Sequence, residues 1–167
     1  GKVAICPMPF SEPRRIGDAL GLGATVSKPV DIDMSEDSLF SYVETDKHEP
    51  ASLNLHNYDQ MYQAWSDYLY KQVPKGMRSI AISHAFVMGG DVGGSERTLS
   101  IGGSEQVSPQ VFKDFHYTAL GHLHGPQRMG ADYIRYSGSP LKYSFDEHTQ
   151  KKSFTIIDMD AKGNVDI

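Results

Sequence analysis

At 167 residues and 18.5 kDa, the chain has the size of one ordinary domain and can bury a sizeable core. Its hydrophobic fraction of 39% argues against a disordered tail, and its net charge of -5 argues against a uniformly basic nucleic-acid clamp. No apolar run approaches the roughly 20 residues of a membrane helix. Cys6 is the only cysteine, which excludes an internal disulfide and favours a cytoplasmic location.

The first half of the chain is expected to hold a strand, a polar loop and a helix. Residues 2–5 have the apolar character of a short buried strand, and a Pro-rich turn follows them. Carboxylates dominate residues 31–49 and predict a solvated polar loop over residues 27–56, in preference to a metal site. Asn57 is placed to cap a helix with Gln60 at the capping-box position. The apolar stripe of this helix predicts core packing; its members are Met61, Trp65, Tyr68, Leu69 and Gln72.

The second half carries two strand-like segments that deliver histidines at their ends. Residues 79–84 end in His84, and residues 117–124 end in Gly121, His122, Leu123 and His124. Histidines at positions i and i+2 of an extended chain project to the same side, roughly 7 Å apart. That spacing allows each to bind a different ion of a metal pair about 3.5–4 Å apart. Imidazole suits Mn, Fe or Zn. Hydrogen-bonded surface histidines are the competing interpretation.

The remaining segments complete a layered pattern. We expect a mobile glycine-rich loop over residues 89–103, a short helix over 109–115, and strands over 133–136 and 153–159. Helices and strands alternate without internal repeats. The chain therefore predicts an α/β or α+β domain, with residues 1–167 forming a single unit.

Four blocks of sequence, in the right order, resemble the SbcD/Mre11 type of nuclease within the calcineurin-like metallophosphoesterases. The first block surrounds His84 and continues through Ser95-Glu96-Arg97 to Gly102-Gly103. The other three occupy residues 111–127, 134–141 and 144–147. Together they are more specific than the Gly-His-x-His pattern alone, and a looser resemblance covers residues 3–9.

The resemblance implies both a fold and an activity. The fold would be the C-terminal portion of a calcineurin-like four-layer αββα sandwich with mixed sheets. The activity would be DNA exonuclease and endonuclease hydrolysis of phosphodiester bonds at DNA ends and hairpins, through two divalent metal ions, usually Mn. By motif, His84 and His122 would bind one ion and His124 the other. Partners would be DNA and an SbcC/Rad50-type ATPase, with a homodimer of this subunit inside a heterotetramer.

The family's other motifs are not matched in this chain. An Asp-x-His, a Gly-Asp with the bridging carboxylate, and a Gly-Asn-His would lie upstream, together with the acid histidine. We therefore expect no catalytic side chain here, only metal ligands that serve a metal-activated water, and an inactive isolated chain. Asp114-Phe115-His116 spells Asp-x-His, but His116 should lie at the opposite end of the strand from His122. His48, His56 and His148 are expected to be surface residues.

Two other functional classes stay open. The chain could belong to a different calcineurin-like phosphodiesterase, or it could be a non-catalytic module that binds DNA ends or an ATPase partner. Its scattered basic residues are better explained as solvated charges than as a DNA-backbone contact. They are Arg128, Arg135, Lys142, Lys151 and Lys152.

Overall fold

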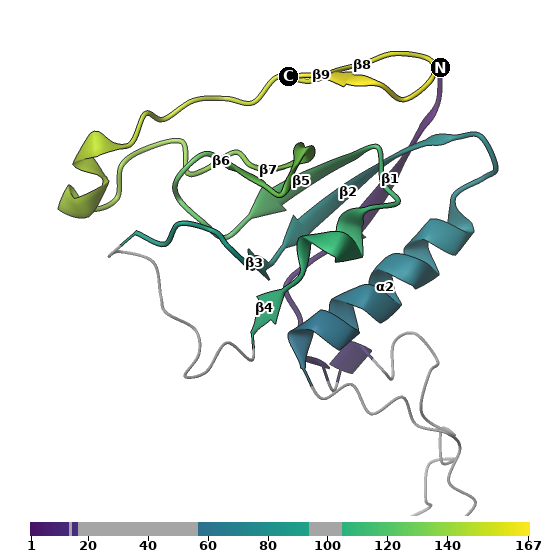
Figure 1. Cartoon of the computed structure of the whole chain (residues 1–167), viewed down its shortest axis with the longest axis horizontal. Helices are drawn as coiled ribbons and strands as arrows, with labels where there is room; N and C mark the ends of the chain where they lie inside the picture. Colours follow the sequence, from purple (N-terminus) through teal and green to yellow (C-terminus); the bar gives the residue numbers. More distant parts are fainter. Residues whose placement is uncertain (14, 17–56, 94–104) are drawn as a thin grey trace, which may run out of the picture.

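The computed structural model of the chain describes residues 1–13, 15–16, 57–93 and 105–167 (Figure 1). The polar loop predicted over residues 27–56, with His48 and His56, lies outside these described residues. So does most of the glycine-rich loop predicted over residues 89–103.

A mixed β-sheet forms the centre of the described structure. Its strand order is β1-β2-β5-β7-β6, with parallel pairing throughout except for β6, which runs antiparallel to β7. The strands are β1 (Val3–Met8), β2 (Arg78–His84), β5 (Tyr117–Gly121), β6 (Gln127–Met129) and β7 (Ala131–Tyr136). Parallel strands joined by helical segments, together with one antiparallel edge strand, confirm the predicted α/β (α+β) class.

Helix α2 (Tyr58–Gln72) begins where the sequence predicts. The side chain of Asn57 caps it by accepting the backbone N–H of Gln60 at 2.9 Å. The buried face, however, is rotated from the predicted stripe. Tyr62 and Ser66 are buried, whereas Tyr68 is 43% exposed. The actual core face therefore follows the contact with the sheet and with the following short helix, not the simple sum of apolar positions.

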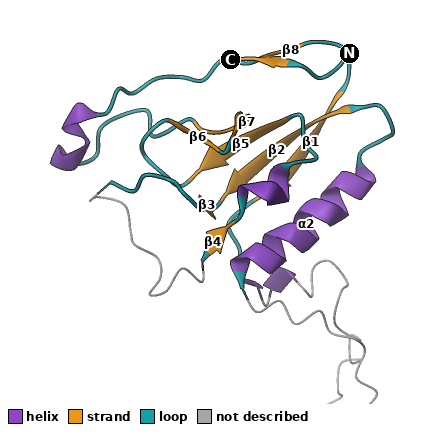
Figure 2. Ribbon diagram, viewed as in Figure 1, coloured by secondary structure: helices purple, strands orange, loops and turns teal. Residues whose placement is uncertain are grey.

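Helical segments lie on one side of the main sheet (Figure 2). Helix α2 contacts β1 and the 3-10 helix η1 (Pro109–Phe112), and η1 contacts β7. The hydroxyl of Ser66 donates to the carbonyl of Val111 at 2.6 Å, which ties the two helical segments together. A buried cluster joins the helices to the sheet through Met8, Met61 and Ala81, among other residues.

The opposite face of the sheet exposes apolar side chains. Ile5 of β1 is 55% exposed and Ile82 of β2 is 47% exposed, while Cys6 and Met8 on alternate positions are buried. The described residues thus form one main sheet covered on one side. The four-layer αββα arrangement stays a prediction.

Two short strand pairs and a second 3-10 helix complete the described structure. They are β3 (Phe86–Val87) with β4 (Gln106–Val107), β8 (Asp158–Met159) with β9 (Val165–Asp166), and η2 (Phe145–Thr149). Arg78 ties β8 to the start of β2 by donating to the carbonyl of Met159 at 3.0 Å. No helix among the described residues combines the length and apolarity required to cross a membrane.

Four sequence predictions need correction at their boundaries. The first strand continues to Met8 across Pro7, which is tolerated because β1 is an edge strand. The helix predicted over residues 109–115 is a single 3-10 turn. Of the strand predicted over 153–159, only Asp158–Met159 pairs. The strand predicted over 117–124 ends at Gly121, with consequences for the histidines.

Candidate functional site

His84 and His122 lie against each other at the carboxyl ends of adjacent parallel strands. His84 is the last residue of β2 and pairs with Gly121, the last residue of β5. The imidazole centroids of His84 and His122 are 5.3 Å apart, and the rings meet edge to face at 82°. The prediction that these two histidines converge at neighbouring strand ends is therefore confirmed.

The backbone at Gly121 and His122 has to be unusual for the rings to meet. A Cβ atom at Gly121 would lie 3.2 Å from Nδ1 of His84, closer than most real contacts, so the absent side chain leaves room for that ring. His122 has φ 117, a positive value that non-glycine residues rarely adopt. The chain leaves the extended conformation there. The argument that His122 and His124 project to one side of a strand is therefore wrong, because it requires an extended backbone.

Two buried tyrosine hydroxyls hold the chain at and just after His84. Tyr62 of α2 donates to the carbonyl of His84 at 2.7 Å. Burial raises the pKa of Tyr62 to about 12, so the hydroxyl keeps its proton as donor at neutral pH. Tyr136 of β7 accepts the N–H of Val87 at 2.8 Å and donates to the carbonyl of Ala85. Sequence reasoning missed both residues, since neither Tyr carries a motif.

A small cavity adjoins the histidine pair. Its volume of about 10 Å³ matches about one water-sized probe. Phe10, whose ring centroid is 6.3 Å from that of His84, lines it, as does Phe86, 5.9 Å from His122. Glu105 also lines it, and its buried Oε2 finds no hydrogen-bond partner among the described residues. After burial itself, the Glu105 charge is the second cause that raises the pKa of Tyr58. Glu105 thus brings a carboxylate to the rim of the cavity, which the sequence did not indicate.

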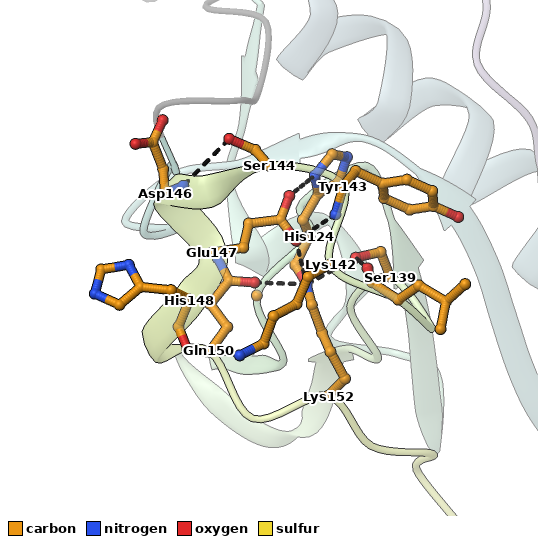
Figure 3. A network of polar contacts seen from close by, with 12 residues as sticks. His124, Ser139, Lys142, Tyr143, Ser144, Asp146, Glu147, His148, Gln150 and Lys152 are labelled. Carbon is orange, nitrogen blue, oxygen red and sulfur yellow. Dashed lines mark hydrogen bonds and ion pairs between the residues drawn. The ribbon is translucent and has the colours of Figure 1, made fainter.

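His124 has a different environment, built from charged side chains (Figure 3). Its Nδ1 lies 2.8 Å from Oε1 of Glu147, and its ring centroid is 5.7 Å from that of Tyr143. Glu147 is fully buried, and its other oxygen lies 2.7 Å from Nζ of Lys152. Glu147 belongs to one of the four blocks that resemble the nuclease family, but nothing in the sequence showed that it would meet His124.

The histidine pair does not make a complete metal site among the described residues. No group of three or more His, Cys, Asp or Glu side chains in that part of the chain is arranged to hold a metal ion. The structure brings His84 and His122 together and orients His124 on Glu147. Joint use of all three as ligands stays a prediction.

His116 and His148 have local roles. His116 lies just before β5, at the far end from His122, and its Nδ1 accepts the N–H of Ser79 at 3.1 Å. A Cβ at Gly163 would lie 1.9 Å from the His116 ring, so this end of the strand packs closely on the C-terminal turn. The predicted separation of His116 from His122 is confirmed. His148 is exposed, as predicted.

Most of the basic residues singled out in the sequence make contacts within the chain. Arg128 and Arg135 approach Asp132 at 3.0 and 4.0 Å, and Lys142 donates to the carbonyl of His148. Lys152 is held by Glu147. These contacts favour an internal structural use of the cations over a DNA-backbone contact.

The fold and the histidine pair define an α/β domain with a candidate metal-binding edge at the carboxyl ends of β2 and β5. No family profile matches the chain. It is, however, 35% identical over 106 residues to the SbcD subunit of the nuclease SbcCD from Staphylococcus epidermidis. The aligned segment is 64% of this chain and only 28% of that protein, so the chain spans little more than a quarter of the relative. A relationship to an SbcD-type nuclease subunit is thereby confirmed over part of the chain.

Proposed function

We propose that this chain is the C-terminal portion of the phosphoesterase domain of an SbcD-type nuclease subunit. The subunit would hydrolyse DNA phosphodiester bonds as an exonuclease and endonuclease, at DNA ends and hairpins. One observation carries the proposal: the rings of His84 and His122 meet 5.3 Å apart at adjacent strand ends. The similarity to the S. epidermidis subunit supports it.

The donor set fits part of a dinuclear metal centre. His84 and His122 would hold one divalent ion, and His124 would contribute to a second, with Mn expected. Gly121 leaves the space that the His84 ring occupies, and Glu147 orients the His124 ring. When bound, such a pair of ions stabilises the attacking and leaving oxygens of a phosphodiester and lowers the pKa of water. The bridging carboxylate would come from motifs upstream of this chain.

The chain's own residues would bind and position. The Tyr62 and Tyr136 hydroxyls fix the backbone that follows β2, so that the His84 ring is held in place when DNA approaches. With a net charge of -5, the chain provides no general attraction for DNA. Phosphate recognition would therefore depend on the metal ions at this edge.

The proposed partners follow from the relative. Its name describes one subunit of a two-part complex, SbcCD. We therefore propose DNA and an SbcC-type ATPase as partners, with a homodimer of this subunit in a heterotetramer located in the cytoplasm.

The decisive experiment uses a full-length subunit that carries this chain. His84→Ala or His122→Ala should abolish Mn-dependent cleavage of a labelled DNA duplex, because each removes a metal ligand and hence several kcal/mol of transition-state stabilisation. His148→Ala, which removes an exposed histidine, is the matched control and should cleave normally. Normal cleavage by either of the first two variants would overturn the proposal. The 167-residue chain alone should be inactive, since three imidazoles do not hold two ions.

A non-catalytic module is the second candidate. The observation in its favour is that the part of the chain that the structure describes holds no group of three metal ligands. Mn-independent binding of DNA ends, with no cleavage by the full-length subunit, would favour it.

A further inference from the structure

Glu147 is a fully buried carboxylate that meets charged or polar groups on both oxygens. Its Oε1 lies 2.8 Å from Nδ1 of His124, and its Oε2 lies 2.7 Å from Nζ of Lys152 (Figure 3). The N–H of Tyr143 also donates to Oε2, at 3.3 Å. A carboxylate removed from water is costly unless its charge is compensated and its lone pairs are used. This arrangement meets both conditions.

The contact with Glu147 determines which nitrogen of His124 carries the proton. An ionised carboxylate can only accept hydrogen bonds, so Nδ1 of His124 has to be the donor. In a neutral imidazole the other nitrogen, Nε2, then carries the lone pair. A metal ion binds an imidazole through such a lone pair, and histidine ligands commonly donate their other N–H to a carboxylate.

Lys152 fixes the carboxylate and the backbone of His124 together. Its Nζ donates to the carbonyl of His124 at 2.9 Å and to Oγ of Ser139 at 2.8 Å. The N–H of Ser139 donates to the same carbonyl at 3.0 Å. Gly138 packs so closely that a Cβ there would lie 2.6 Å from the His124 carbonyl oxygen. Both the peptide and the ring of His124 are therefore held.

We propose that Glu147, locked by Lys152, is a positioning residue for His124. It keeps the proton on Nδ1 and directs the Nε2 lone pair toward a divalent metal ion. The metal part of this inference rests on the proposed function, whereas the proton position does not. Neither residue is expected to touch the DNA or the reacting atoms.

The proton position can be measured without any metal. In the ¹⁵N-labelled, metal-free chain, long-range ¹H–¹⁵N spectra of the histidine rings should show His124 protonated at Nδ1 and unprotonated at Nε2. A His124→Gln variant assigns the signals. Glu147→Ala should populate the Nε2–H form, because the Nδ1 proton loses its acceptor. A wild-type ring protonated at Nε2 alone, or an unchanged tautomer in Glu147→Ala, would overturn the positioning role.

A second variant covers the case in which Glu147→Ala does not fold. The double variant Glu147→Gln with Lys152→Met keeps an amide oxygen that accepts from Nδ1 and removes the lysine that would face the amide N–H groups. It should retain the Nδ1–H form. Asp146→Ala is the matched control, because Asp146 is the exposed acidic neighbour of Glu147 on η2, and it should leave the His124 spectrum unchanged. Loss of the Nδ1–H form in the control, or its loss in a folded double variant, would contradict the proposal.

Titration with Mn²⁺ alone, followed by the electron paramagnetic resonance signal of the free ion, then tests the metal part in a full-length subunit. Glu147→Ala should weaken Mn²⁺ binding by about 10- to 100-fold, as loss of a carboxylate behind a ligating histidine typically does. Unchanged binding in Glu147→Ala, alongside weakened binding in His122→Ala, would overturn the metal role of Glu147 only. Unchanged binding in His84→Ala and His122→Ala would instead overturn the proposed metal centre.

Discussion

The two histidine environments of this chain are held by different forces. The segment that carries His84 is fixed through its backbone: neutral hydroxyls of Tyr62 and Tyr136 bond to main-chain groups at residues 84–87. His124 is fixed through its side chain by a buried carboxylate that is itself held by Lys152. Both arrangements orient an imidazole, but they should respond differently to the loss of one partner.

A neutral hydrogen bond and a buried ion pair differ in what remains after a substitution. Removing a hydroxyl leaves an uncharged group with an unmet hydrogen bond, which costs about 1–3 kcal/mol when buried. Removing one member of a buried ion pair leaves an uncompensated charge, which typically costs about 3–5 kcal/mol. The His124 region should therefore behave as one unit, and the His84 region as a set of separable contacts.

The largest effect is expected for Lys152→Met. It leaves the fully buried Glu147 without its cation and should lower the free energy of unfolding by about 3–5 kcal/mol, measured by urea denaturation. The double variant Glu147→Leu with Lys152→Met removes both charges and should recover most of the loss. A Lys152→Met variant within about 1 kcal/mol of wild type, the range typical of surface pairs, would show that Glu147 does not depend on this pair.

Tyr136→Phe should have an intermediate effect. Its hydroxyl bonds both the N–H of Val87 and the carbonyl of Ala85, and both groups would be left inside the protein. We expect a loss of about 1–3 kcal/mol in the same measurement. Tyr143→Phe removes a hydroxyl from a side chain that is 66% exposed, and it should change little. Equal effects of the two substitutions would contradict the anchoring role of Tyr136.

The smallest effect is expected for Tyr62→Phe, with a loss of about 0.5–1.5 kcal/mol at neutral pH. Its pH dependence is more diagnostic. Because burial raises the pKa of Tyr62 from 10.0 to about 12, its contribution is complete below pH 10 and is lost as the pH rises toward 12. Unfolding measured across this range should show a shallower decline for Tyr62→Phe than for wild type. Identical slopes would mean that Tyr62 does not titrate with unfolding.

The sequence by itself determined the local features of the candidate site. Apolar runs ending in histidine predicted the strand ends, and the pairing of His84 with Gly121 places them side by side. Asn57 predicted the start of α2, and the length of the intervening strand separated His116 from His122. These features depend on neighbours in the chain, whose spacing can be read directly.

Tertiary structure decided how each imidazole is held. His124 meets a carboxylate 23 residues away, and Tyr62 bonds to a carbonyl 22 residues away. No periodicity links such positions, because their meeting depends on how η2 and α2 pack after the sheet has formed. The positive φ of His122 has the same origin. An extended backbone is the local preference, and the contacts of its ring with His84 and Phe86 accompany the turn that replaces it.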